Sequence, residues 1–337
     1  MRISIYPLLL LSLLAAFRVL LYLNKRSDMP AVSYVRVQKE QSLLEKRIYA
    51  LYPSPHADLL LGMTIGSETI KNQKIFYQNL ISTNTVHVVV VSGYNVALLI
   101  DLLCRFMPNA LERRREVLLV LVVSLYAILC GLQPPVVRAS LMGYISSVSR
   151  ARGRPVAAIY MLWLTCALMV LVTPANILSL SFWLSALSSF GLVAFESRIK
   201  KMLDYITVHE IVTYFSTSFV CQLVVWPLIS YKFSRVNLLG PMYNVFILWL
   251  VPVCTILGGV ALLVSFLPLP FSLVVSFLIY PFFDLFVFLI NLLSKVKLFD
   301  IGYTLPLIYM LTYYLVVALF AYKNLFVHSS SKRILTT

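Results

Sequence analysis

The polar side chains of residues 83–105 are those whose types and spacing could do chemistry. The stretch reads TNTVHVVVVSGYNVALLIDLLCR, an apolar run interrupted by polar groups and a glycine. On an uninterrupted helix at about 100° per residue, four polar groups share one narrow face. These four are His87, Tyr94, Asp101 and Arg105. Asn95 flanks that face and Ser92 lies further round. The spacing therefore predicts a polar stripe on an otherwise lipid-compatible helix.

This polar stripe has two interpretations. Ionisable groups at membrane depth are costly and mark substrate or ion pathways, so the stripe would line a passage. Alternatively, His87 and Arg105 lie at the two membrane interfaces, where arginine extends to water, and Asp101 only pairs with Arg105. Gly93 offers a variant of the first interpretation, a break into two half-helices beside protein or water. Either way, we expect the segment to lie against other protein or a watery cavity.

Arg138 is a second candidate for chemistry. It follows Pro134-Pro135 by one short turn, which places it just inside the outer end of its predicted span. A guanidinium there either binds phosphate near a pore mouth or extends to the outer interface.

A serine stripe with a period of four lies further along the chain, at Ser181, Ser185 and Ser189. These serines either line the same passage or hydrogen-bond between helices, and we favour the second interpretation.

The chain shows no pattern typical of an enzyme. Its five cysteines lie in or beside apolar runs without CxxC spacing, and its four histidines lack metal-ligand spacing. The sequence contains neither a Walker-type glycine loop nor an HExxH motif. We therefore expect no catalytic residue, no metal and no cofactor.

The elements that must position these groups are membrane helices. Of the 337 residues, 60% are hydrophobic and 12% charged, whereas soluble domains carry roughly 25% charged residues. Apolar runs long enough to cross a hydrocarbon core of about 30 Å recur along the chain. The sequence predicts an all-α polytopic membrane protein with about ten transmembrane helices, of which one or two are broken or re-entrant. The predicted spans are 3–23, 85–107, 116–133, 135–149, 156–173, 177–195, 210–231, 238–265, 269–294 and 303–322. The second contains Gly93 and the eighth contains Pro241 and Pro252, so these two are the candidates for a break.

Short basic loops set the predicted orientation. The clusters at 113–115, 150–154 and 198–201 share one side with the C-terminal tail, and the positive-inside rule makes that side cytoplasmic. The predicted segments are a first transmembrane helix (1–23), an extracytoplasmic or amphipathic linker (24–83), the main transmembrane domain (84–325) and a cytoplasmic tail (326–337). The linker is also rich in lysine and arginine, which conflicts with the positive-inside rule because this segment is predicted to lie outside. The net charge of +15 suits anionic lipid head groups or a polyanion such as nucleic acid.

Four patterns resemble the competence domain of the ComEC family, the bacterial inner-membrane channels for DNA uptake. They follow the family's order and spacing from about residue 57 to about residue 255. The segments are VHVVVVSGYNVALL, LYAILCGLQPPVVRASLMG, LSFWLSALSSFGLV and VCQLVVWPLISYKFSRVNLLGPMYN. The chain departs from the family pattern at Asn95, where a histidine is common, and at Trp183, where a glutamine is common.

The resemblance implies that 84–325 is a competence-type transmembrane channel domain in the bacterial cytoplasmic membrane. Such a channel would conduct single-stranded DNA during natural transformation. Gln222 and Asn244 match the family's polar positions, and Pro227 matches its kink. The sequence contains neither a full OB-like domain nor a metallo-β-lactamase-like domain, so the resemblance implies no enzyme. The implied partners are single-stranded DNA, membrane lipids, a DNA receptor, a separate nuclease, a cytoplasmic motor and further copies of the chain.

The candidate DNA path joins the stripe to the positions that the resemblance indicates. Its members are His87, Ser92, Gly93, Tyr94, Asn95, Asp101, Arg105, Arg138, Ser185, Gln222 and Asn244. Two other functions stay open at this point. A secondary transporter of a small anion would also use broken helices and intramembrane polar groups. A non-conducting membrane scaffold would need none of these residues to face water.

Overall fold

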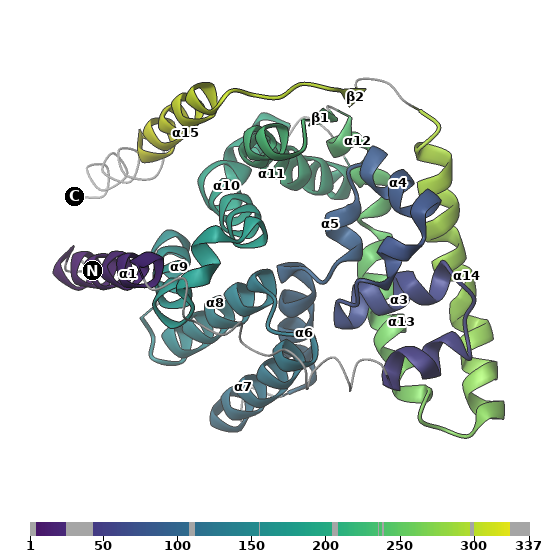
Figure 1. Ribbon diagram of the computed structural model, residues 1–337. Helices are drawn as coiled ribbons and strands as arrows, with labels where there is room; N and C mark the ends of the chain where they lie inside the picture. The colour runs from purple at the N-terminus through teal and green to yellow at the C-terminus, as the bar shows by residue number, and fades with distance from the viewer. Residues whose placement is uncertain are drawn as a thin grey trace.

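Helices make up most of the computed structural model, which describes residues 5–24, 43–107, 112–154, 156–203, 208–234, 236–237, 239–296 and 300–323 (Figure 1). The predicted all-helical class is confirmed. Two strands of two residues each, β1 (Val236–Asn237) and β2 (Asp300–Ile301), pair antiparallel. The predicted tail 326–337 lies outside the described residues.

The helices are α1 (Ile5–Asn24), α3 (His56–Ile65), η1 (Thr69–Asn72), α4 (Lys74–Ser82), α5 (Val86–Val89), α6 (Gly93–Phe106), α7 (Glu112–Leu129), α8 (Pro134–Ala151), α9 (Ala158–Val172), η3 (Pro174–Leu178), α10 (Leu180–Met202), α11 (His209–Phe233), α12 (Gly240–Ile247), α13 (Leu250–Val264), α14 (Leu269–Leu293) and α15 (Leu307–Tyr322).

Three of the described helices, α10, α11 and α14, are long and apolar enough to cross a membrane. The bent pair α12 and α13, which turns by 50° at its break, makes a fourth span if the two count as one. This bend agrees with the predicted break in the span 238–265. Pro252 contributes to the bend because it cannot donate a backbone hydrogen bond to the preceding turn. The described residues do not confirm the predicted count of about ten spans.

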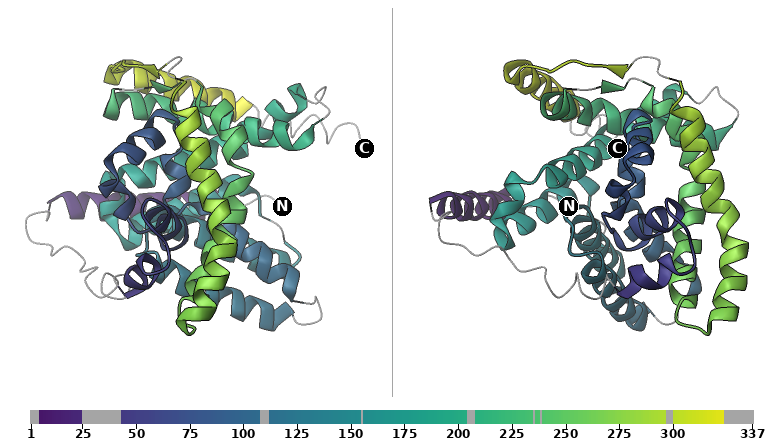
Figure 2. Two further views of the ribbon diagram at one scale, coloured as in Figure 1. Left: turned by 90° about the vertical axis from the view of Figure 1, so that its right-hand side faces the viewer. Right: turned by 45° about the vertical axis from the view of Figure 1, so that its right-hand side comes forward.

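The α3–α14 region comprises α3, α4, α5, α12, α13 and α14 and contains the largest hydrophobic cluster of the described residues. Helices α13 and α14 run side by side and α3 packs against both (Figure 2). Every residue of α3 is buried, as expected for a helix that is apolar on nearly all sides. Close approach is possible because Gly258 of α13 faces Thr64, and a Cβ on this glycine would lie 2.7 Å from the Thr64 side chain.

The buried α3 lies inside the segment 24–83 that the sequence predicts to be a linker. Ten residues of helix reach only about 15 Å, so a search for membrane spans passes over α3. Part of the predicted linker is therefore a core element. The side of the membrane on which the rest of 24–83 lies stays a prediction.

The α8–α10 region comprises α6, α8, α9 and α10. Helix α8 contacts the other three (Figure 1), and fewer of its side chains are buried than in α3. Helices α6 and α8 approach closely at Gly143, where a Cβ would overlap the Ile100 side chain. Helix α1 packs on the far side of α9. This region presents α6 and α10 to α8, and so determines what surrounds Arg138.

Helix α15 packs on α11 at its proline. Pro227 has no N–H, so the carbonyl of Leu223 one turn earlier loses its helical donor. The Tyr313 hydroxyl donates to that carbonyl at 2.8 Å, and the Tyr314 hydroxyl donates to Val224 O at 3.1 Å. Tyr313 therefore supplies the hydrogen bond that the missing N–H of Pro227 leaves unmade, and Tyr314 adds a bond to the next carbonyl.

Candidate functional site

The break between α5 and α6 is the first feature of the candidate site. Val90 and Ser92 have extended backbones, with ψ of 138° and 168°. The Ser92 hydroxyl caps α6 by accepting a hydrogen bond from Tyr94 N at 3.3 Å. The prediction of an uninterrupted helix across 83–105 is therefore wrong, and the alternative of two half-helices is confirmed. His87 lies on α5, so it does not share a helix face with Tyr94.

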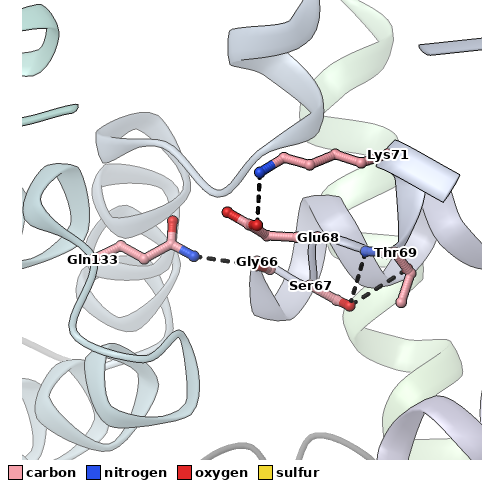
Figure 3. Close-up of polar contacts among 6 residues, drawn as sticks. All are labelled: Gly66, Ser67, Glu68, Thr69, Lys71 and Gln133. Carbon is pink, nitrogen blue, oxygen red and sulfur yellow. Dashed lines mark hydrogen bonds and ion pairs between the residues drawn. The ribbon is translucent and has the colours of Figure 1, made fainter. Parts of the chain in front are cut away.

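The C-terminal end of α3 holds α6 and the α7–α8 turn in place. Asn95 donates from Nδ2 to Met63 O at 2.8 Å. Gln133 donates from Nε2 to Gly66 O at 3.1 Å, as Figure 3 shows. The last carbonyls of a helix lack partners within it, so these amides provide the missing donors. Asn95 is only 3% exposed. Its side chain anchors α6 to α3 and does not face solvent.

The loop after α3 is fixed by its own polar contacts, which Figure 3 shows. Gly66 ends the helix with φ of 73°, a left-handed conformation that glycine adopts readily. Glu68 and Lys71 form an ion pair at 2.6 Å, and the Ser67 hydroxyl lies 3.4 Å from Thr69 N. The anchor for Gln133 is therefore an ordered turn.

Arg138 lies in the first turns of α8, which begins at Pro134. Its Nε donates to Ser185 Oγ of α10 at 2.8 Å, and its Nη1 is 3.4 Å from Met142 Sδ. The guanidinium also reaches the start of α6, because a Cβ on Gly93 would lie 2.8 Å from Arg138 Nη2. The structure therefore brings together three of the predicted residues, Gly93, Arg138 and Ser185, from three helices.

The charge of Arg138 is not balanced by a neighbour. Among the described residues, no carboxylate forms an ion pair with it, and its hydrogen-bond partners are a hydroxyl and a thioether. The Cys166 and Cys221 side chains lie near enough to interact with its charge. A partly desolvated guanidinium with free donors binds carboxylate or phosphate strongly. The neighbouring N-terminus of α6 adds donors and a favourable dipole for an anion.

Two aromatic side chains lie near each other at the start of α6. Tyr94 is the second residue of α6 and is 50% exposed. Tyr214 of α11 lies close enough to interact with it electrostatically. Bases of single-stranded nucleic acid stack on such rings while cations follow the backbone. An exposed aromatic residue therefore directly follows Gly93, the residue that the Arg138 guanidinium approaches.

Asp101 and Arg105 form a separate pair near the other end of α6. Arg105 Nε donates to Asp101 Oδ2 at 2.7 Å, four residues apart as the sequence predicts. Both side chains are more than half exposed. They share the exposed face of α6 with Tyr94 but lie about two turns further along the helix. They are not in contact with Arg138.

Gln222 and Asn244 belong to another polar cluster. The Gln222 Oε1 accepts from Asn84 Nδ2 at 3.4 Å, and its Nε2 donates to Asn237 O. Asn244 donates from Nδ2 to Ser218 Oγ at 2.6 Å. These bonds join α11 to α12 and to the chain before α5. In the described part of the chain no hydrogen bond joins either residue to Arg138.

Sequence reasoning missed several residues that build the site. The long-range bonds from Asn95 to Met63 and from Gln133 to Gly66 have no local signal, since they join positions 32 and 67 apart. The signal that could have indicated α3 is a short apolar run closed by a glycine, HADLLLGMTIG. Tyr214 could not be singled out among the 20 tyrosines of the chain.

Comparisons with known proteins agree with these observations. The family model described as "Competence protein" matches residues 67–326. ComE operon protein 3 of Bacillus subtilis (strain 168) is 26% identical over 222 residues. That alignment covers 63% of this chain and 27% of the relative, so the chain spans about a quarter of the relative's length. No solved structure matches the chain.

Proposed function

Because this chain belongs to the competence protein family, as its four motifs predict, we propose that it takes part in DNA uptake during natural transformation. In this proposal the chain is a membrane channel for single-stranded DNA in the bacterial cytoplasmic membrane. The family match and the similarity to a ComE operon protein support the role in uptake. The DNA receptor, the nuclease and the cytoplasmic motor stay predictions.

The observation that carries the channel proposal is the unbalanced charge of Arg138. A helical span that only needs an anchor would direct its arginine to water or pair it with a carboxylate. Arg138 instead lies between α6, α8 and α10, with Ser185 as its only hydrogen-bonded oxygen among the described residues. A passing phosphate would supply the anionic partner that the protein does not. A small-anion transporter could use the same group, and membership of the competence family favours DNA.

Substitution of Arg138 tests this proposal. Hydrogen bonds to charged groups contribute roughly 1.5–3 kcal/mol, so we expect Arg138→Ala to lower transformation about 10- to 100-fold per molecule of membrane-inserted protein. Arg138→Lys retains a point charge without the planar fork of donors, and should keep partial function. The measurement is transformation frequency divided by the amount of chain in the membrane, with DNA bound at the cell surface scored separately.

The matched control is Arg152→Ala, because Arg152 is an exposed arginine at the end of the same helix. Its transformation frequency should stay near the wild-type value. Wild-type frequency per molecule in Arg138→Ala would end the phosphate-contact proposal. Full rescue by lysine together with low abundance of the alanine variant would show that Arg138 only anchors α8.

A further inference from the structure

Three residues at or just before the start of α3 each carry a buried polar atom without a partner. Tyr52 Oη, His56 Nδ1 and Asp58 Oδ2 are buried and have no hydrogen-bond partner among the described residues. Asp58 is 1% exposed and His56 is 7% exposed. Buried polar atoms in proteins are nearly always paired, so an unpaired group calls for a functional explanation. Two of these atoms, Tyr52 Oη and His56 Nδ1, belong to side chains whose rings stack on the same tyrosine of α14, Tyr280.

A polar stripe of α14 faces these residues. Ser276, Tyr280 and Asp284 follow one another at intervals of four, so they share one face of the helix. His56 Nε2 lies 3.1 Å from Asp284 Oδ1, and the imidazole stacks on the Tyr280 ring with centroids 4.6 Å apart. Tyr52 lies on the other side of Tyr280, at 6.5 Å between centroids.

The stripe lies near the middle of a membrane-spanning helix. Helix α14 has 25 residues, which corresponds to about 37 Å and exceeds a hydrocarbon core of about 30 Å. Asp284 is three residues from the helix midpoint, or roughly 4.5 Å. Ionisable groups at this depth are rare because they are expensive, and they commonly form proton relays.

The other charged groups around α3 are satisfied elsewhere. Glu45 accepts a hydrogen bond from Ser67 Oγ at 2.6 Å, and Glu68 pairs with Lys71 at 2.6 Å. Arg47 donates from Nη1 to Ser265 O at 3.0 Å and lies over the Phe266 ring. The remaining titratable groups on helices that pack against α3 are His87 of α5 and Cys254 of α13. In the described part of the chain, no lysine or arginine forms an ion pair with Asp58 or Asp284.

Asp58 has a separate partner, because Tyr49 donates its hydroxyl to Asp58 Oδ1. Burial, together with this hydrogen bond, raises the pKa of Tyr49 to about 12. Tyr49 therefore stays protonated at every ordinary pH and acts as a fixed donor. Asp58 is two residues from His56 on the same helix, and side chains at this spacing do not face each other.

We propose that His56 and Asp284 form a proton-binding site at mid-depth of α14. A proton that arrives on Asp284 Oδ1, whose side chain is 60% exposed, transfers to His56 Nε2. Asp284 is then a carboxylate and His56 an imidazolium, and the imidazolium becomes neutral again by releasing a proton from either nitrogen. This proposal does not depend on what the chain transports.

Nitrogen NMR of ¹⁵N-histidine tests the site in the full chain reconstituted in lipid nanodiscs. The chain has four histidines, so His56→Gln assigns the His56 signal by its loss. In the wild type, acid should convert this signal to the doubly protonated form. We expect Asp284→Asn to weaken or abolish that form, because an amide cannot balance the imidazolium charge.

The matched control is Glu68→Gln, which removes one exposed carboxylate outside the cluster and should leave the His56 signal unchanged. A His56 signal that never titrates in the wild type would overturn the proposal. Wild-type titration of His56 in Asp284→Asn would also overturn it.

Discussion

In the α3–α14 region, His56 and Asp284 face each other at 3.1 Å beside the largest hydrophobic cluster. In the α8–α10 region, Arg138 contacts a hydroxyl of Ser185 and the sulfur of Met142 and has no carboxylate partner among the described residues. Both regions place an ionisable group among apolar helices. The first supplies an acid for its base, and the second leaves a cation without a counter-charge.

This difference separates a site that keeps its ligand within the protein from one that needs a ligand from outside. A paired acid and base can exchange a proton without any other partner. An unpaired guanidinium binds an anion strongly, because folding has already removed the guanidinium from water and binding does not repeat that cost in free energy. The two regions therefore suit different ions, a proton in the α3–α14 region and phosphate in the α8–α10 region.

The largest expected effect is on the stability of the α3–α14 region. Phe283→Ala removes a fully buried ring of α14, and we expect a loss of about 3–5 kcal/mol in the free energy of unfolding. The measurement is thermal or denaturant unfolding of the purified chain in one detergent. Phe282→Ala is the matched control, because that neighbouring ring is 40% exposed. Equal losses in the two variants would contradict the dense packing of this region.

A smaller effect, on activity rather than stability, is expected in the α8–α10 region. Gly93→Val places a side chain where a Cβ would be 2.8 Å from Arg138 Nη2, so the guanidinium must move. We expect transformation per molecule to fall about tenfold, or roughly 1.4 kcal/mol, at normal abundance. Gly259→Val is the control, because a Cβ there meets nothing within 4 Å. Normal transformation in Gly93→Val would remove α6 from the Arg138 site.

The sequence predicted those features that depend on local pattern. Apolar runs predict the helical class, and the four-residue spacing predicts the Asp101–Arg105 pair, which the structure contains. Gly93 and the preceding serine predict a break as one alternative, since Ser92 is a good helix cap. Arg138 was singled out because an arginine just inside a predicted span is unusual.

Features that depend on long-range packing could not be predicted from the pattern. The contact of Arg138 with Ser185 joins residues 47 apart, and that of His56 with Asp284 joins residues 228 apart. Asn95 was expected to flank a passage, but its amide is directed to Met63 of a helix that no span search reveals. One chain offers no signal for such pairs, because hydropathy and spacing report only on neighbours along the sequence.

The accessibility of Tyr94 tests most directly whether the Arg138 site lies on a DNA path. In a background without the five native cysteines, Tyr94→Cys should react with a membrane-impermeant thiol reagent, because Tyr94 is 50% exposed. Val96→Cys, at a position that is 0% exposed, should not react. The account predicts that modification at 94 blocks transformation and that DNA in transit slows the reaction. Equal reactivity at 94 and 96, or a rate at 94 that DNA in transit leaves unchanged, would contradict it.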